Sequence, residues 1–161
     1  MRTLITVREP GEDPVPLVIE GDRFTDPDIG PIDDEIPTGH LYALPGLADC
    51  HAHLGVGSIG QMGRLADDEI RSNCVNNAWM QVEGGVLVIS DKGSSSDVSL
   101  EILEAPPETR PAMQMAGRII ASPGGYYPGY GVEVDDAGLA DAVRAACATS
   151  ASWVKIIGDW P

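Results

Sequence analysis

Strand patterns and helix patterns alternate along the chain from Leu44 onward, and this alternation restricts the possible folds more than any other feature. Runs typical of strands lie at Leu44–Gly55, Val86–Ile89, Pro111–Ile120 and Ser152–Gly158. Helical patterns separate them, beginning at Asp67, at Asp97 and near Asp135–Asp136. Alternation of this kind implies a parallel sheet with right-handed crossover connections. The sequence therefore predicts the α/β class for this part of the chain.

The first predicted helix has a clear start and a clear end. Three acidic residues, Asp67 to Glu69, favour a helix N-terminus, and Gly84-Gly85 ends the pattern. Apolar residues recur at intervals of three and four and predict one buried stripe: Ile70, Cys74, Val75, Ala78, Trp79 and Val82. The uninterrupted apolar run Val86–Ile89 predicts a strand that is buried on both faces.

Other elements are shorter. A short helix is predicted over Asp97–Glu104, capped by Ser96 or Asp97 and ended by Pro106-Pro107. The third predicted helix carries its apolar residues on one side: Leu139, Ala142, Val143 and Ala146. A Gly-rich loop is predicted between Gly55 and Gly63.

The first 44 residues have a different character. Short β-like runs at Leu4–Val7, Pro16–Glu20 and Leu41–Leu44 are separated by clusters of Gly, Pro and Asp. This pattern predicts a small sandwich or meander beside the main domain. We therefore expect two domains, residues 1–44 and residues 45–161.

Two histidines are spaced for metal binding. Along a strand, side chains alternate between the faces, so Asp49, His51 and His53 are expected on one face. Neutral imidazole is the commonest protein ligand of Zn, Fe, Mn or Ni. Taken alone, the pair is equally consistent with two ordinary histidines on a strand, because short motifs also occur by chance.

Lys155 interrupts the apolar run Trp153–Ile157. Desolvating an ammonium group is costly unless a partner compensates the charge. Burial also favours the neutral amine, which is the reactive form. The alternatives are a lysine paired with a carboxylate and a lysine whose ammonium group reaches solvent at the strand end.

The segment Pro45–Leu54 resembles the first barrel strand of the amidohydrolase superfamily, in which Pro-Gly, two apolar residues and Asp-x-His-x-His open a metal-dependent hydrolase barrel. The segment Ala151–Ile157 resembles the family's stretch around a lysine at the end of the fourth strand. The resemblance implies that His51, His53 and Lys155 are metal ligands. It also implies one or two divalent ions, zinc being the expected metal, and a CO2-derived carbamate on Lys155.

Two further segments resemble the imidazolonepropionase-like and Xaa-dipeptidase-like members. Glu83–Asp91 matches a segment that ends in Arg-Asp, with Ser90 in place of the Arg, so that Asp91 carries over as a carboxylate that supports the site. In the next matching segment, Tyr126 replaces a histidine after Gly124-Gly125. Tyr126, Tyr127 and Tyr130 are expected to line the mouth of a substrate pocket, or to belong to an ordered loop.

The resemblance implies half of a (β/α)8 TIM barrel, strands one to four, preceded by a small side sandwich. The implied reaction is hydrolysis of an amide or cyclic amide C–N bond of a small-molecule substrate by metal-activated water. Family members take two more histidines and a proton-shuttle Asp from later strands, and no histidine follows His53. We therefore expect no catalytic residue within this chain, and expect a C-terminal half to complete the site.

Two alternatives to half of a hydrolase barrel remain open. The first is a non-catalytic fragment or interaction module that pairs with itself or a partner through open sheet edges. The second is a complete small α/β domain whose histidines merely adjoin the core.

Composition restricts the partners and the compartment. The formal net charge is −15, from 25 acidic and 10 basic residues, which argues against binding to nucleic acid or to anionic membranes. Three cysteines, Cys50, Cys74 and Cys147, lack a disulfide framework and are expected as small core residues. With no long apolar run, these features predict a cytoplasmic protein.

Overall fold

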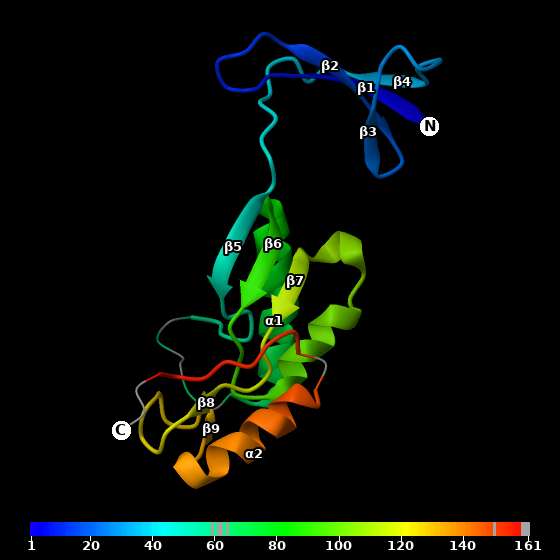
Figure 1. Ribbon diagram of the computed structural model, residues 1–161. Coiled ribbons are helices and arrows are strands. Elements are labelled where there is room, and N and C mark those ends of the chain that lie inside the picture. Colours follow the sequence, from blue (N-terminus) through cyan, green and yellow to red (C-terminus); the bar gives the residue numbers. More distant parts are fainter. Residues whose placement is uncertain (59, 61–62, 64, 150, 159–161) are drawn as a thin grey trace. The chain divides into compact units, whose positions relative to one another are not determined.

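The structure is a computed structural model that describes residues 1–58, 60, 63, 65–149 and 151–158. The chain divides into two compact units, Met1–Pro45 and a second unit that begins at Gly46 (Figure 1). Within the described residues, the first unit holds a four-stranded sheet, and the second holds a three-stranded sheet and a two-stranded sheet. Part of the predicted Gly-rich loop, at 59, 61 and 62, lies outside the described residues.

Strands β1 to β4 of the first unit form one sheet in the order β3-β2-β1-β4. Strand β2 pairs antiparallel with both β1 and β3, and β4 pairs with β1 in parallel. The strands are β1 (Arg2–Val7), β2 (Val15–Glu20), β3 (Arg23–Thr25) and β4 (Asp34–Ile36).

The predicted strand at Leu41–Leu44 is wrong, because only Tyr42 bridges to Arg8. Near this bridge, a side chain hydrogen-bonds to the backbone of β1. The hydroxyl of Thr38 accepts from the N–H of Thr6 and donates to its carbonyl, at 3.0 and 2.7 Å.

Three parallel strands form the central sheet of the second unit: β5 (Leu47–Ala52), β6 (Val86–Asp91) and β7 (Ala112–Met115). Figure 1 shows their arrowheads pointing the same way, toward the segments that carry β8, β9 and α2. The predicted parallel arrangement is confirmed for these strands. The C-terminal ends of all three therefore lie at one edge of the sheet, where parallel α/β proteins place their functional groups.

Helix α1 (Asp67–Glu83) has the predicted ends. The carboxylate of Glu69 accepts from the N–H of Ala66 at 3.1 Å, and Gly84 terminates the helix before Gly85, whose φ is +82°. The segment η2 (Asp97–Glu104) has the predicted bounds and the Ser96 cap but is a 3-10 helix, and η3 (Pro107–Thr109) follows it. Among the described residues, no helix has both the length and the apolar character to cross a bilayer.

The core of this unit lies where α1 and η2 pack on one face of the sheet. Its buried members are Ala52, Leu54, Ile70, Cys74, Ala78, Ile89, Val98, Leu100, Ile102 and Met115. The prediction that Val86–Ile89 is buried on both faces is wrong, because Leu87 and Val88 are about half exposed, at 51% and 50%. The predicted stripe of α1 is also too wide, since Val75 and Trp79 face outward.

The third and fourth predicted strands are shorter than expected. Within the third predicted strand, only β7 (Ala112–Met115) and β8 (Ile120–Ala121) form strands. The strand is interrupted between them because the Asp97 carboxylate accepts from the N–H of Arg118 at 2.8 Å. The fourth segment runs parallel beside them through single bridges, from Trp153 to Ala116 and from Ile156 to Ile120. The remaining elements are β9 (Val132–Glu133), which pairs with β8, and α2 (Asp136–Cys147).

Burial differs from the prediction at α2 and at two cysteines. None of the residues of α2, all of them described, is buried, so its predicted apolar side has no full cover. The N-cap is Asp135, whose carboxylate accepts from the N–H of Gly138 at 2.9 Å. Cys74 is buried as expected, whereas Cys50 and Cys147 are exposed.

Candidate functional site

The two histidines of the His-x-His motif lie side by side where β5 ends. Their ring centroids are 5.4 Å apart and the rings are inclined by 57°. His51 is exposed and His53 is half-buried. The pairing of β5 with β6 is irregular between Asp49 and Ala52, so the strand does not alternate strictly around His51.

The imidazole of His53 has a fixed orientation. Its Nδ1 lies 2.8 Å from the carbonyl oxygen of Gly93, in the turn after β6. Because a carbonyl only accepts, Nδ1 carries a proton, and in the neutral imidazole the lone pair is then on Nε2. A metal-ligating histidine is commonly oriented by such a bond from its other nitrogen.

Asp91, the last residue of β6, hydrogen-bonds to the backbone on both sides of the contact between His53 and Gly93. Its side chain is 1% exposed, and its carboxylate accepts from the N–H of Leu54 at 2.6 Å and of Gly93 at 2.7 Å. Burial raises the pKa of Asp91 to about 6, although the two backbone hydrogen bonds act in the opposite direction. The predicted supporting carboxylate thus lies directly behind the turn that carries His53.

The segment that carries Lys155 is tied to the same strand end. The carbonyl oxygen of Asp91 accepts from the indole Nε1 of Trp153 at 3.0 Å, and the ammonium group of Lys92 lies 4.0 Å from the centre of the Trp153 ring. Lys155 is half-buried, and its ammonium group has no ion-pair partner among the described residues. The alternative in which Lys155 pairs with a carboxylate is therefore not found among the described residues.

A chain of aromatic contacts continues from His53 into the loop 122–131, which follows β8. Tyr130 lies edge-on to His53 with centroids 6.2 Å apart, Tyr126 is 6.0 Å from Tyr130, and Tyr127 is 5.0 Å from Tyr126. Tyr130 is 1% exposed, burial raises the pKa of its hydroxyl, and that hydroxyl has no hydrogen-bond partner within the described part of the chain. The contact of Tyr130 with His53 was not predicted, since nothing in the sequence spacing distinguishes it from its neighbours.

The described residues contain no cluster of three or more His, Cys, Asp or Glu side chains positioned to hold a metal ion. Asp49 does not join the imidazoles, because its carboxylate bonds the N–H of His51 at 2.9 Å and reaches the amide of Gln81 on α1 at 3.5 Å. The donors present are therefore two imidazoles. They suit a divalent metal that takes its remaining ligands from other groups.

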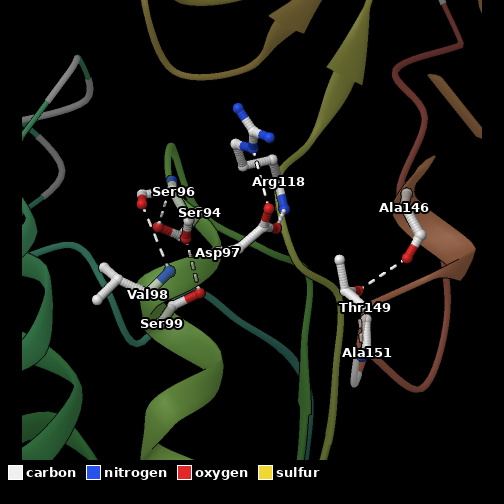
Figure 2. A network of polar contacts seen from close by, with 9 residues as sticks. All are labelled: Ser94, Ser96, Asp97, Val98, Ser99, Arg118, Ala146, Thr149 and Ala151. Atoms are coloured by element: carbon white, nitrogen blue, oxygen red, sulfur yellow. Dashed lines mark hydrogen bonds and ion pairs between the residues drawn. The ribbon is translucent and has the colours of Figure 1, made fainter.

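Another polar network lies in the connection after β6 (Figure 2). The carboxylate of Asp97 accepts from the backbone N–H of Arg118 at 2.8 Å and from its Nε at 3.1 Å. Ser96 caps η2 through the N–H of Val98. This network stiffens the connection between the turn after β6 and the segment after β7.

The arrangement has clear structural relatives. A prolidase complexed with N-methylphosphonate-L-proline matches 99% of this chain with a TM-score of 0.69 and 19% identity, and a Xaa-Pro dipeptidase with bound methionine matches 97% with a TM-score of 0.66 and 20% identity. An amidohydrolase matches 99% with a TM-score of 0.59 and 15% identity. The chain is structurally similar to the amidohydrolases. It covers 47% of each of these three relatives, so the similarity extends over about half of their length.

The chain also has sequence relatives. Uncharacterized proteins of Mycobacterium bovis and Mycobacterium tuberculosis are 32% identical to it over 145 residues, which is 89% of this chain. It spans 35% of the length of these curated relatives. No family model matches the chain.

Proposed function

We propose that this chain is the N-terminal half of a (β/α)8 metal-dependent hydrolase of the amidohydrolase type, which cleaves an amide or cyclic amide C–N bond. The observation that carries the proposal is the imidazole pair. His51 and His53 lie together at the end of a parallel strand, and Nδ1 of His53 is engaged by the Gly93 carbonyl, so that Nε2 is the ring nitrogen available to a metal. The similarity to amidohydrolase structures supports it independently.

His51 and His53 would hold the metal, and Lys155 is proposed as the third ligand through a carbamate formed with CO2. A divalent ion, zinc in our proposal, would lower the pKa of a bound water and polarise the scissile carbonyl. The segment of Lys155 is bonded to the end of β6, because the indole Nε1 of Trp153 donates to the Asp91 carbonyl. Tyr126 is half-buried and Tyr127 is exposed, and both are proposed to contact the substrate.

A second polypeptide segment is needed for activity in this proposal. It would supply further histidines and the proton-shuttle Asp, and it would cover the half-exposed Leu87 and Val88 of β6. We further propose a cytoplasmic location and a small-molecule substrate, with neither nucleic acid nor membrane as partner, in keeping with the net charge of −15.

The test combines the chain with a segment that supplies the later strands. The purified complex is assayed for bound metal and for hydrolysis of a panel of dipeptides, N-acyl amino acids and cyclic imides. We expect metal-dependent hydrolysis that is abolished in His51→Ala and His53→Ala and retained in His40→Ala, an exposed histidine of the first unit. If the complex contains no metal and the His51→Ala protein behaves as the wild type, the proposal is rejected.

One observation favours a second candidate, an interaction module without catalysis. Three large apolar side chains of the sheet, Leu47, Leu87 and Val88, are about half exposed, at 55%, 51% and 50%. Exposed apolar groups on strands favour association through the sheet. Self-association in sedimentation experiments, unaffected by chelators and by His51→Ala, would support this candidate over the first.

A further inference from the structure

We propose that Asp91 is a positioning residue for His53, which sets the orientation and the proton position of its imidazole. The inference deepens the proposed function and rests on it for the metal. Asp91 touches neither substrate nor metal in this account. It acts through the two backbone segments that its carboxylate joins.

Both oxygens of the Asp91 carboxylate are used. Oδ2 accepts from the N–H of Leu54, the residue directly after His53, and Oδ1 accepts from the N–H of Gly93, whose carbonyl receives the His53 proton. One carboxylate therefore fixes both ends of the bond between His53 and Gly93. The hydrogen bonds form a closed ring that leads from His53 through Leu54, Asp91 and Gly93 and back to Nδ1.

An amide cannot replace this carboxylate. Asn has one carbonyl oxygen and one NH2 group, and the NH2 group would face a backbone N–H, which is also a donor. One of the two turns would then lose its bond inside a buried site, where an unpaired donor is costly. The bonds lie at 2.6 and 2.7 Å and the side chain is 1% exposed, so solvent does not substitute for the missing acceptor.

The backbone of the same residue holds the segment of Lys155. The Asp91 carbonyl accepts from the N–H of Ala116 and from Nε1 of Trp153, both at 3.0 Å. Trp153 precedes Lys155 by two residues. Asp91 is therefore the common attachment point of the segments that carry His53 and Lys155.

Asp97 provides a matched control. Its carboxylate also accepts from a backbone N–H and from a second donor, both on Arg118 (Figure 2). It belongs to the same connection after β6, but it makes no bond to the segments of His53 or Lys155 in the described structure. Asp97→Asn thus alters a more exposed pair of hydrogen bonds in the same connection without touching the ring of bonds around His53.

The primary experiment measures the proton position on His53 by long-range nitrogen–proton correlation NMR at neutral pH, without metal. We expect the Nδ1–H tautomer in the wild type and in Asp97→Asn, and a mixture dominated by other states in Asp91→Asn. Retention of a fully populated Nδ1–H tautomer in Asp91→Asn would overturn the proposal, and so would an Nε2–H tautomer in the wild type.

Zinc titration is the second readout. Loss of an outer hydrogen-bonding partner of this kind typically weakens metal binding by about 10- to 100-fold, and we expect that range for Asp91→Asn and no change for Asp97→Asn. If the wild type binds no zinc while the tautomer still changes in Asp91→Asn, the proposed function fails and the positioning role stands. If the Asp91→Asn protein does not fold, scalar couplings in the wild type from the amide nitrogens of Leu54 and Gly93 to the Asp91 carboxyl carbon decide, and their absence overturns the proposal.

Discussion

The Nδ1 atom of His53 lies 2.8 Å from the carbonyl oxygen of Gly93, a residue 40 positions later in the chain. This bond joins the end of β5 to the turn after β6, and it leaves Nε2 as the only nitrogen of that ring available to a metal. The carbonyl can occupy this position because Gly93 has a φ of +98°, a conformation that other residues rarely adopt.

Replacement of Gly93 by Ala is expected to destabilise the fold strongly. The added Cβ would lie 2.5 Å from the carbonyl oxygen of Gly117, in addition to the strain of a positive φ. Gly124→Ala is the matched control, since Gly124 has a φ of +70° with nothing within 4 Å of the added Cβ. Strain alone costs about 1–2 kcal/mol, so urea unfolding should show a clearly larger loss for Gly93→Ala. Equal losses in the two variants would contradict the tight packing of this turn.

Stability should depend on pH through Asp91. Its pKa is raised from 3.8 to about 6 by burial, so the folded state binds this proton more tightly than the unfolded chain. The contribution of Asp91 to stability therefore falls as the pH rises from about 4 to about 6, by at most about 3 kcal/mol at about 1.4 kcal/mol per pKa unit. We expect the free energy of unfolding of the metal-free wild type, relative to Asp91→Asn, to decrease over this window and to level off above it. A difference that is constant from pH 4 to pH 7 would contradict the burial of an ionisable carboxyl group.

Lys155 is predicted to form a carbamate in the metal-loaded complex. The chain has only two lysines, Lys92 and Lys155, which makes the assignment simple. After exchange with 13C-labelled bicarbonate, we expect a carbamate signal in the wild type and in Lys92→Arg, and none in Lys155→Arg. A signal that disappears with Lys92 instead would place the modification on the wrong residue for this account.

Local sequence patterns were sufficient for the elements that depend on local physics. The acidic start of α1, the double glycine at its end and the Ser96 cap of η2 are encoded within a few residues, and each is found where the pattern predicts it. Parallel pairing of β5, β6 and β7 also followed from the alternation of strands and helices.

Features that depend on distant contacts were less predictable. The third strand is interrupted because the Asp97 side chain takes over a backbone donor at Arg118, and no periodicity reveals that substitution. Exposure of Leu87 and Trp79 likewise depends on what packs against each face, whereas an apolar run reports only that a face is suited to burial.

The site was predictable in its residue types and less so in its geometry. The spacing of His51 and His53 indicated an imidazole pair, and their rings do lie together. The bonds that orient His53 come from Gly93 and Asp91, some 40 positions away, and the sequence contains no signal for the contact with Tyr130. The ligand role of Lys155 stays a prediction.

The most direct test of the central claim is calorimetric titration of the chain with zinc at pH 7.5, comparing wild type, His51→Ala, His53→Ala and the control His40→Ala. We expect a 1:1 complex in the wild type and in His40→Ala, and at least about a tenfold weaker affinity when either His51 or His53 is removed. Equal zinc binding by all four proteins, or loss of binding only in His40→Ala, would contradict the assignment of the imidazole pair as a metal site.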